Sequence, residues 1–150
     1  MNTTETTIIP YHKDLWGEVV SVWERSARAT HHFLKPGEID FYKKLVLQID
    51  FTSFNVFCLV REGEVIGILG TEGDSLEMLF MAPEYIGCGL GAKLMTFAVE
   101  ELKSTRVEVN EENTHAIDFY SKFGFVVRGR TEKDPQGRDH PMVQMELVKS

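Results

Sequence analysis

Apolar residues in the first half of the chain recur with the spacing of one strand and then of two helices. The β-branched residues Thr7, Ile8 and Ile9 predict the strand. Two stripes with helical spacing follow it, and Asp14 is the expected N-cap of the first helix. The stripes consist of Leu15, Val19, Val22, Trp23 and Ala27, and of Ile39, Tyr42, Leu45, Val46 and Ile49. Each helix therefore has one apolar face that must pack against a sheet.

The middle of the chain changes from strand spacing to an alternation of strand and helix. Three short apolar runs separated by turn residues predict an antiparallel meander. These runs lie at residues 56–60, 65–69 and 76–81. A glycine-rich turn, a helix with one apolar face and a strand at 106–109 come next, and this order predicts a βαβ unit with parallel strands. The apolar face of the helix is formed by Leu90, Leu94, Phe97, Ala98 and Leu102.

The last third of the chain adds a helix and two strands. The helix ends at Gly124, which suits a left-handed cap. Strands at 125–130 and 142–147 complete the pattern. No repeat or linker divides the sequence, so we expect residues 1–150 to form a single α/β domain. Its sheet should be mixed and mostly antiparallel, with one parallel βαβ unit and helices on both faces.

Composition and charge narrow the class of partner. The chain has 150 residues, of which 43% are hydrophobic, and it carries 16 Lys and Arg against 23 Asp and Glu, for a net charge of -7. This acidic balance argues against a nucleic acid or an anionic membrane as partner and favours a cationic one. Cys58 and Cys88 alone cannot form a zinc site, and we expect no metal. Residues 1–10 lack the features of a secretory signal, so we expect a cytoplasmic protein.

Three glycines at alternate positions mark the turn before the helix of the βαβ unit. Gly87, Gly89 and Gly91 free successive main-chain N–H groups from side chains, next to the positive end of a helix. Such a turn predicts a binding site for an anionic group such as a pyrophosphate. The alternative is that the glycines only permit a tight turn.

A dinucleotide fingerprint is a competing interpretation of the same turn. Gly87, Gly89 and Ala92 fit its G-x-G-x-x-G/A spacing, and Glu108 lies at about the distance of a ribose-binding acid. Residues 82–86 separate the turn from its strand, however, and a meander precedes it. Both features argue against a nicotinamide-dependent oxidoreductase.

Two motifs resemble those of the GCN5-related N-acetyltransferases. The first is the family's strand end and Gln/Arg-x-x-Gly-x-Gly/Ala turn, with Ile86 where the family usually has Arg or Gln. It is matched by Met81, Ala82, Pro83, Gly89, Leu90 and Gly91. The second is Asn-x-x-Ala-x-x-Phe-Tyr-x-x-x-Gly-Phe, matched in full by Asn113, Ala116, Phe119, Tyr120, Gly124 and Phe125. The resemblance covers nearly the whole chain in element order.

The resemblance implies an acetyl-CoA site in a V-shaped opening of the sheet. In the family, the strand before the glycine turn and the strand after the next helix diverge, and the pantetheine arm of acetyl-CoA lies between them. Leu79 and Met81 would bind the arm through their main chains, the turn would hold the pyrophosphate, and Asn113 would fix the arm from the other side. The residues expected to bind acetyl-CoA are Leu79, Met81, Ile86, Gly87, Cys88, Gly89, Leu90, Gly91 and Asn113.

The implied reaction is direct transfer of acetyl to a primary amine, which could be a small amine, a peptide N-terminus or a lysine. Tyr120 is the expected general acid for the leaving thiolate, and a core tyrosine is the alternative. Glu77 is the candidate base, directly or through a water, and an exposed edge carboxylate is the alternative. His31, His32 and His140 could wall the acceptor pocket or lie in solvated loops.

A second hypothesis comes from another functional class. Ile86, in place of a polar residue that contacts the phosphates, is compatible with a catalytically silent acyl-CoA-binding or regulatory module. Cys88 is expected to be a small spacer in the turn rather than an acyl carrier. The closing strand and its loop could mediate a homodimer.

Overall fold

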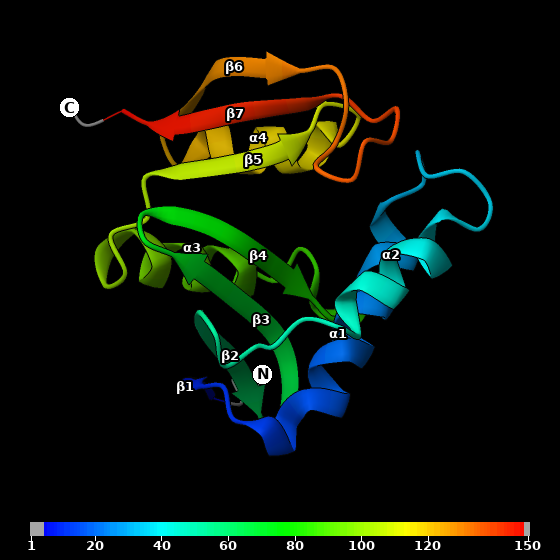
Figure 1. Ribbon diagram of the computed structural model, residues 1–150. Helices are drawn as coiled ribbons and strands as arrows, with labels where there is room; N and C mark the ends of the chain where they lie inside the picture. The colour runs from blue at the N-terminus through cyan, green and yellow to red at the C-terminus, as the bar shows by residue number, and fades with distance from the viewer. Residues whose placement is uncertain (1–4, 149–150) are drawn as a thin grey trace.

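The computed structural model of the protein describes residues 5–148, whose strands form one sheet (Figure 1). The strand order is β1-β2-β3-β4-β5-β7-β6. The strands are β1 (Thr6–Pro10), β2 (Asn55–Arg61), β3 (Glu64–Glu72), β4 (Ser75–Met81), β5 (Arg106–Asn110), β6 (Phe125–Thr131) and β7 (Met142–Leu147). The helices are α1 (Trp16–Thr30), α2 (Glu38–Val46), α3 (Leu90–Glu100) and α4 (Thr114–Lys122), with 3₁₀ turns η1 (Lys13–Leu15) and η2 (Pro83–Tyr85). None of these helices is long and apolar enough to cross a bilayer.

β4 and β5 are the parallel pair of the sheet, and they are joined over a very short length. Within the described chain their pairing comprises Ser75 with Arg106 and Leu76 with Val107. Every other pair of neighbouring strands is antiparallel. Beyond Leu76 the two strands diverge, so the sheet opens between a half formed by β1–β4 and a half formed by β5–β7 (Figure 1). The predicted mixed sheet with one parallel βαβ unit is confirmed.

Two hydrophobic cores lie on opposite faces of this sheet. Successive side chains of a strand point to opposite faces, and the neighbours Cys58 and Leu59 of β2 belong to different cores. α1 supplies Val19 to one core, whereas α3 supplies Leu94 and α4 supplies Tyr120 to the other. α1 and α2 therefore cover one face and α3 and α4 the other (Figure 1), and the predicted placement of helices on both faces is confirmed.

The start of α1 differs from its prediction. The helix begins at Trp16 with Leu15 as N-cap, and Asp14 lies inside η1. In this 3₁₀ turn the Leu15 amide donates to the carbonyl of His12 at 2.9 Å. The chain thus makes one tighter turn before the α-helix, and that turn moves the helix start past Asp14.

The end of α2 also differs from its prediction. The helix ends at Val46, although the apolar stripe continues to Ile49. The amides of Gln48 and Ile49 donate to the carbonyls of Leu45 and Val46, three residues back. This tighter spacing is typical of the last turn of a helix. Ile49 still packs against the core on this face.

Replacement of Leu94 by alanine should destabilise the protein strongly. Leu94 is 0% exposed in the core beneath α3, so Leu94→Ala should lower the free energy of unfolding by about 2–5 kcal/mol through lost burial and a cavity. Urea unfolding measures this change. Leu47→Ala is the matched control, because Leu47 is 42% exposed. Equal losses in the two variants would contradict the core assignment.

Candidate active site

The opening between β4 and β5 leaves main-chain groups of β4 without a strand partner. The Ala82 amide donates to the carbonyl of Ile66 in β3 at 2.8 Å. Because the main-chain groups of successive residues point to alternate sides of a strand, those of Leu79 and Met81 face away from β3. β5 has diverged at this point, so the main chains of Leu79 and Met81 lie along an open edge of the sheet.

A β-bulge at Glu77 marks the place where the opening begins. The register between β3 and β4 shifts at Gly70, which pairs with Met78 and leaves Glu77 without a partner in β3. The Glu77 carboxylate is exposed and accepts a hydrogen bond from the Ser75 hydroxyl at 2.7 Å. Bulges redirect side chains and often occur beside functional sites. Glu77 therefore stands at the solvent side of the point where β4 and β5 separate.

The glycine turn lies at the start of α3 and borders free space. Gly87 and Gly89 have φ angles of +86° and +82°, which is the left-handed conformation that side chains disfavour. A Cβ atom at either glycine would meet nothing within 4 Å. No side chain caps Gly89, so the first-turn amides of α3 are free to bind an anion. Ile86 and Cys88 are exposed on the same turn.

The end of the glycine turn packs against α4. A Cβ atom on Gly91 would lie 3.7 Å from the ring of Phe119. Phe119 packs edge-on against Tyr120, with ring centroids 5.4 Å apart. Tyr120 is 8% exposed, and burial raises the pKa of its phenol. The phenol is therefore protonated at neutral pH.

Two asparagines lie where β5 leads into α4. Asn113 is the N-cap of α4, and its side-chain oxygen accepts a hydrogen bond from the Ala116 amide at 3.1 Å. This cap uses the side-chain oxygen and leaves the side-chain nitrogen for another partner. The side-chain oxygen of Asn110 is buried and has no hydrogen-bond partner among the described residues. Buried acceptors usually have a donor, so this region suits a ligand that brings an N–H group.

Comparison with known proteins agrees with this geometry. Residues 52–127 match the family described as an acetyltransferase (GNAT) domain. The chain is 33% identical over 132 residues to the peptidyl-lysine N-acetyltransferase YjaB of Escherichia coli (strain K12). The matched region covers 87% of this chain and 89% of YjaB. The chain belongs to the GNAT acetyltransferase family. Its activity is therefore of the acetyl-CoA-dependent N-acetyltransferase class, and the dinucleotide interpretation of the glycine turn is set aside.

Solved structures of GNAT proteins have the same fold. The solution structure of apo YjaB from Escherichia coli matches with a TM-score of 0.88 at 30% identity, and the match covers 97% of this chain and 99% of that one. The PaiA N-acetyltransferase from Thermoplasma acidophilum, solved in complex with coenzyme A, matches with a TM-score of 0.73 at 18% identity. That match covers 95% of this chain and 99% of PaiA and supports the fold alone.

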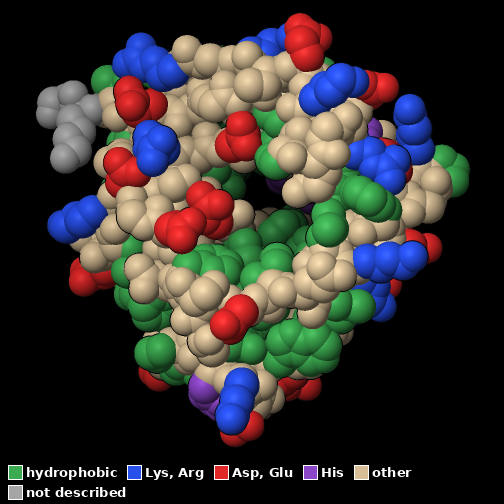
Figure 2. All heavy atoms as spheres, in the orientation of Figure 1, with side chains coloured by type: hydrophobic (Ala, Val, Ile, Leu, Met, Phe, Trp, Pro, Cys, Tyr) green, Lys and Arg blue, Asp and Glu red, His purple; other side chains and the backbone are tan. Residues whose placement is uncertain are grey.

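The GNAT fold of this chain has a hollow between its two halves, which Figure 2 shows lined with hydrophobic side chains and flanked by acidic ones. A row of aromatic rings runs from β4 to the loop before β7. The His31 ring lies 6.4 Å from Phe80 of β4 and 5.3 Å from Phe33, and Phe33 lies 5.9 Å from His140. Burial, and then the neighbouring His32, lower the pKa of His31, so the imidazole of His31 is neutral. His32 is exposed.

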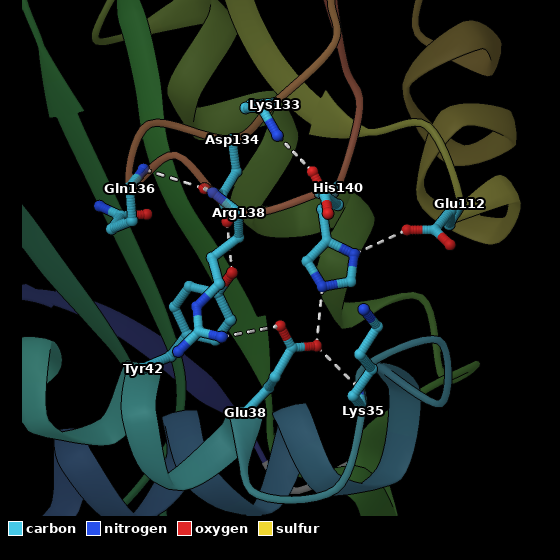
Figure 3. A network of polar contacts seen from close by, with 10 residues as sticks. Lys35, Glu38, Tyr42, Glu112, Lys133, Asp134, Gln136, Arg138 and His140 are labelled. Carbon is cyan, nitrogen blue, oxygen red and sulfur yellow. Dashed lines mark hydrogen bonds and ion pairs between the residues drawn. The ribbon is translucent and has the colours of Figure 1, made fainter.

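His140 is buried at the end of this row, so the solvated-loop interpretation is wrong for it. The residue is 3% exposed, and its Nδ1 and Nε2 atoms each lie 2.8 Å from a carboxylate oxygen, of Glu112 and Glu38 respectively (Figure 3). Carboxylates accept hydrogen bonds, so both ring nitrogens donate and the ring is an imidazolium. Burial alone would lower the pKa of His140, but the hydrogen bonds to Glu112 and Glu38 outweigh it and raise that pKa.

Sequence reasoning did not identify Glu38, Glu112, Phe33 or Phe80 as neighbours of the site. Glu38 and His140 are 102 residues apart, and no spacing pattern links residues at that distance. Phe33, in the polar connection between two helices, was the one local signal, because an apolar ring in such a segment needs a place to pack. Within residues 5–148, no three His, Cys, Asp or Glu side chains are grouped as metal ligands.

The stability contributed by His140 should fall as the pH rises. A group whose pKa is raised by folding contributes its full stabilisation at pH values below its pKa in the unfolded chain, which is about 6.5 for histidine. This stabilisation is lost as the pH rises through the pKa of the folded state. The charged groups around the ring are Glu38 of α2, Glu112 of the β5–α4 connection, and Arg138 and Asp139 of its own loop. The difference in Tm between wild type and His140→Gln should therefore be largest near pH 6 and shrink toward pH 9.

Thermal unfolding at several pH values in that range measures this difference, while Glu38 stays ionised throughout. His115→Gln is the control, since His115 is exposed on α4. A difference that grows as the pH increases would contradict the imidazolium assignment for His140.

Proposed function

We propose that this protein transfers the acetyl group of acetyl-CoA to the side-chain amine of a lysine in a protein or peptide. The observation that carries the proposal is the 33% identity, over 87% of the chain, to a protein named as a peptidyl-lysine N-acetyltransferase. The open edge of β4, the glycine turn and the buried Tyr120 support the same reaction. A small amine and a peptide N-terminus are the competing acceptors, and an assay with all three separates them.

Residues between 79 and 113 offer contacts to the pantetheine arm and to the pyrophosphate of acetyl-CoA. The main chains of Leu79 and Met81 bind the pantetheine arm as they would bind another strand. The amides from Gly87 to Gly91 and the N-terminal dipole of α3 hold the pyrophosphate. The free side-chain nitrogen of Asn113 approaches the arm from α4. The thioester of acetyl-CoA supplies an activated acyl group at the point where β4 and β5 separate.

Glu77 acts as the general base that removes a proton from the acceptor amine. A lysine ammonium group, with a pKa of about 10.4, is almost wholly protonated at neutral pH. The Glu77 carboxylate takes one proton from it, directly or through a water, and leaves a neutral amine as nucleophile. The net charge of -7 and the acidic side chains beside the hollow in Figure 2 favour the approach of a cation.

Tyr120 assists the leaving group. The amine nitrogen forms a bond to the acetyl carbon while the carbon–sulfur bond breaks, and the sulfur leaves with the electron pair. Burial keeps the phenol of Tyr120 protonated, so it can donate its proton to this thiolate. The nitrogen of the new amide gives its remaining extra proton to solvent and the phenolate regains one from solvent, so each turnover releases one net proton, the one that Glu77 removed.

Tyr120→Phe should abolish most turnover and keep acetyl-CoA binding. Removal of a general acid should lower kcat by roughly 10²–10⁴-fold, whereas the contacts to acetyl-CoA come from other residues. Coenzyme A release with a lysine peptide measures kcat, and calorimetry measures the Kd of acetyl-CoA. Tyr11→Phe is the control, since Tyr11 loses the same hydroxyl while its ring stays packed against Phe51 on the other face.

Turnover that survives in Tyr120→Phe would exclude Tyr120 as the acid. Loss of acetyl-CoA binding in the variant would assign Tyr120 a structural role instead. No coenzyme A release by the wild type with any amine, together with normal binding of acetyl-CoA, would favour the silent acyl-CoA-binding module.

Acetyl-CoA should protect Cys88 from alkylation. Cys88 is exposed on the glycine turn, whereas Cys58 is buried and desolvation, and then Glu18, raise its pKa to about 12. Iodoacetamide should therefore modify Cys88 alone in the folded protein. Acetyl-CoA at about 100 times its Kd leaves about 1% of sites free and should slow this reaction about 100-fold.

Mass spectrometry of the alkylated protein measures the rate at each cysteine. NADH at the same concentration is the control, and it should give no protection. An unchanged alkylation rate with acetyl-CoA would place the pyrophosphate away from this turn.

A further inference from the structure

Polar contacts join α2 to the loop before β7, on the side of the molecule opposite the β4–β5 junction (Figure 1). His140 bridges Glu38 of α2 and Glu112 of the β5–α4 connection (Figure 3). In the same loop, the Arg138 guanidinium lies 3.8 Å from the centre of the Phe41 ring. The two halves of the sheet are thus linked on two sides, by strand pairing on one side and by this bridge on the other.

Hydrogen bonds within the loop before β7 fix its conformation. The side-chain oxygen Oδ1 of Asp134 accepts hydrogen bonds from the amides of Gln136 and Arg138 at 2.9 and 2.8 Å. Its other oxygen accepts one from the Tyr42 hydroxyl of α2 (Figure 3). These contacts fold the loop on itself and fix it against the helix. His140 therefore reaches Glu38 from a defined position.

The first turn of α2 is fixed in the same way. Glu38 is 5% exposed, and its carboxylate oxygen Oε1 accepts a hydrogen bond from the Lys35 amide at 2.7 Å as well as from His140. Arg138 lies 3.6 Å from its other oxygen. The bridge consequently holds the connection between α1 and α2, which carries His31 and Phe33 of the aromatic row.

The other end of the bridge fixes the wall opposite that row. Glu112 lies two residues after Asn110, whose buried side-chain oxygen has no partner within the described chain. Val109 packs in the core beneath α3 and α4, so strand alternation turns Asn110 toward the face of α1 and α2. The two walls of the hollow on this face are therefore an aromatic row and a segment with an open hydrogen-bond acceptor.

We propose that the Glu38–His140–Glu112 bridge is the positioning element of the acceptor site and sets the separation of these two walls for one unbranched alkyl-ammonium chain, such as a lysine side chain. The inference rests on the proposed function and adds to it the residues that determine acceptor binding. The glycine turn and Asn113, which are proposed to bind acetyl-CoA, lie at the starts of α3 and α4, whereas the aromatic row lies on the face of α1 and α2. Loss of the bridge therefore affects the acceptor and spares acetyl-CoA.

Glu112→Gln tests the proposal with little risk to folding, because the Glu112 side chain is 41% exposed. Glu111→Gln is the matched control, since Glu111 is the adjacent residue, is also 41% exposed and pairs with Arg130 instead. Steady-state kinetics with a lysine peptide and acetyl-CoA give both KM values. Glu112→Gln should raise the KM of the peptide about tenfold, the effect of one lost charge-assisted hydrogen bond.

The KM of acetyl-CoA should stay within about twofold in Glu112→Gln, and Glu111→Gln should change neither KM. A merely structural role would move both KM values together, and this outcome would overturn the proposal. ¹⁵N NMR of the imidazole gives a readout without turnover: the wild-type His140 imidazolium should titrate above the ordinary histidine pKa, and it should titrate at lower pH in Glu112→Gln.

The failures of the two proposals are distinguishable. A wild-type protein that acetylates no lysine peptide overturns the proposed function and this inference with it. An active wild type whose peptide KM is unchanged in Glu112→Gln overturns this inference alone, as does a wild-type His140 imidazolium that titrates below the ordinary histidine pKa.

Discussion

The two residue pairs that join β4 to β5 constrain the whole molecule. Ser75 with Arg106 and Leu76 with Val107 hold the parallel strands together at one end, and Arg106 reinforces the junction through an ion pair with Asp74 at 2.7 Å. Past these pairs, β4 keeps β3 on one side and has no strand on the other. Main-chain polar groups need partners, so this edge is left to water or to a ligand with amide groups that lies along it.

The two faces of the opening differ in how they hold the halves together. The core beneath α3 and α4 contains Leu94 together with Val107 and Met145, so apolar packing crosses from one half to the other on that face. The core beneath α1 and α2 draws its residues from the first half alone among the described residues. On the second face, the halves meet through the charged bridge and the contact between the Phe33 and His140 rings, and a hollow remains beside them (Figure 2).

Sequence patterns predicted what local physics determines. The helical and strand spacing gave the elements in their correct order, and Gly124 has the predicted left-handed conformation with φ of +97°. The position of Asp14 was mispredicted because a 3₁₀ turn precedes α1 and no residue pattern marks it. The glycine turn could be located because its signal spans five residues. The hydrogen bond between His140 and Glu38 could not be predicted, because it joins segments that are 102 residues apart in the sequence.

A bridge that buries an imidazolium and one of its two carboxylates contributes little net stability by itself. Desolvation of a carboxylate and an imidazolium opposes their attraction, and apolar residues of similar size often stabilise a fold as well or better. Hydrogen bonds have direction, however, and an imidazolium with two carboxylates at 2.8 Å fixes both separation and orientation. Apolar contacts at the same place would draw the two halves together and fill the hollow. The charged bridge keeps them apart at a set distance, which is the property that an acceptor site between α2 and the β5–α4 connection requires.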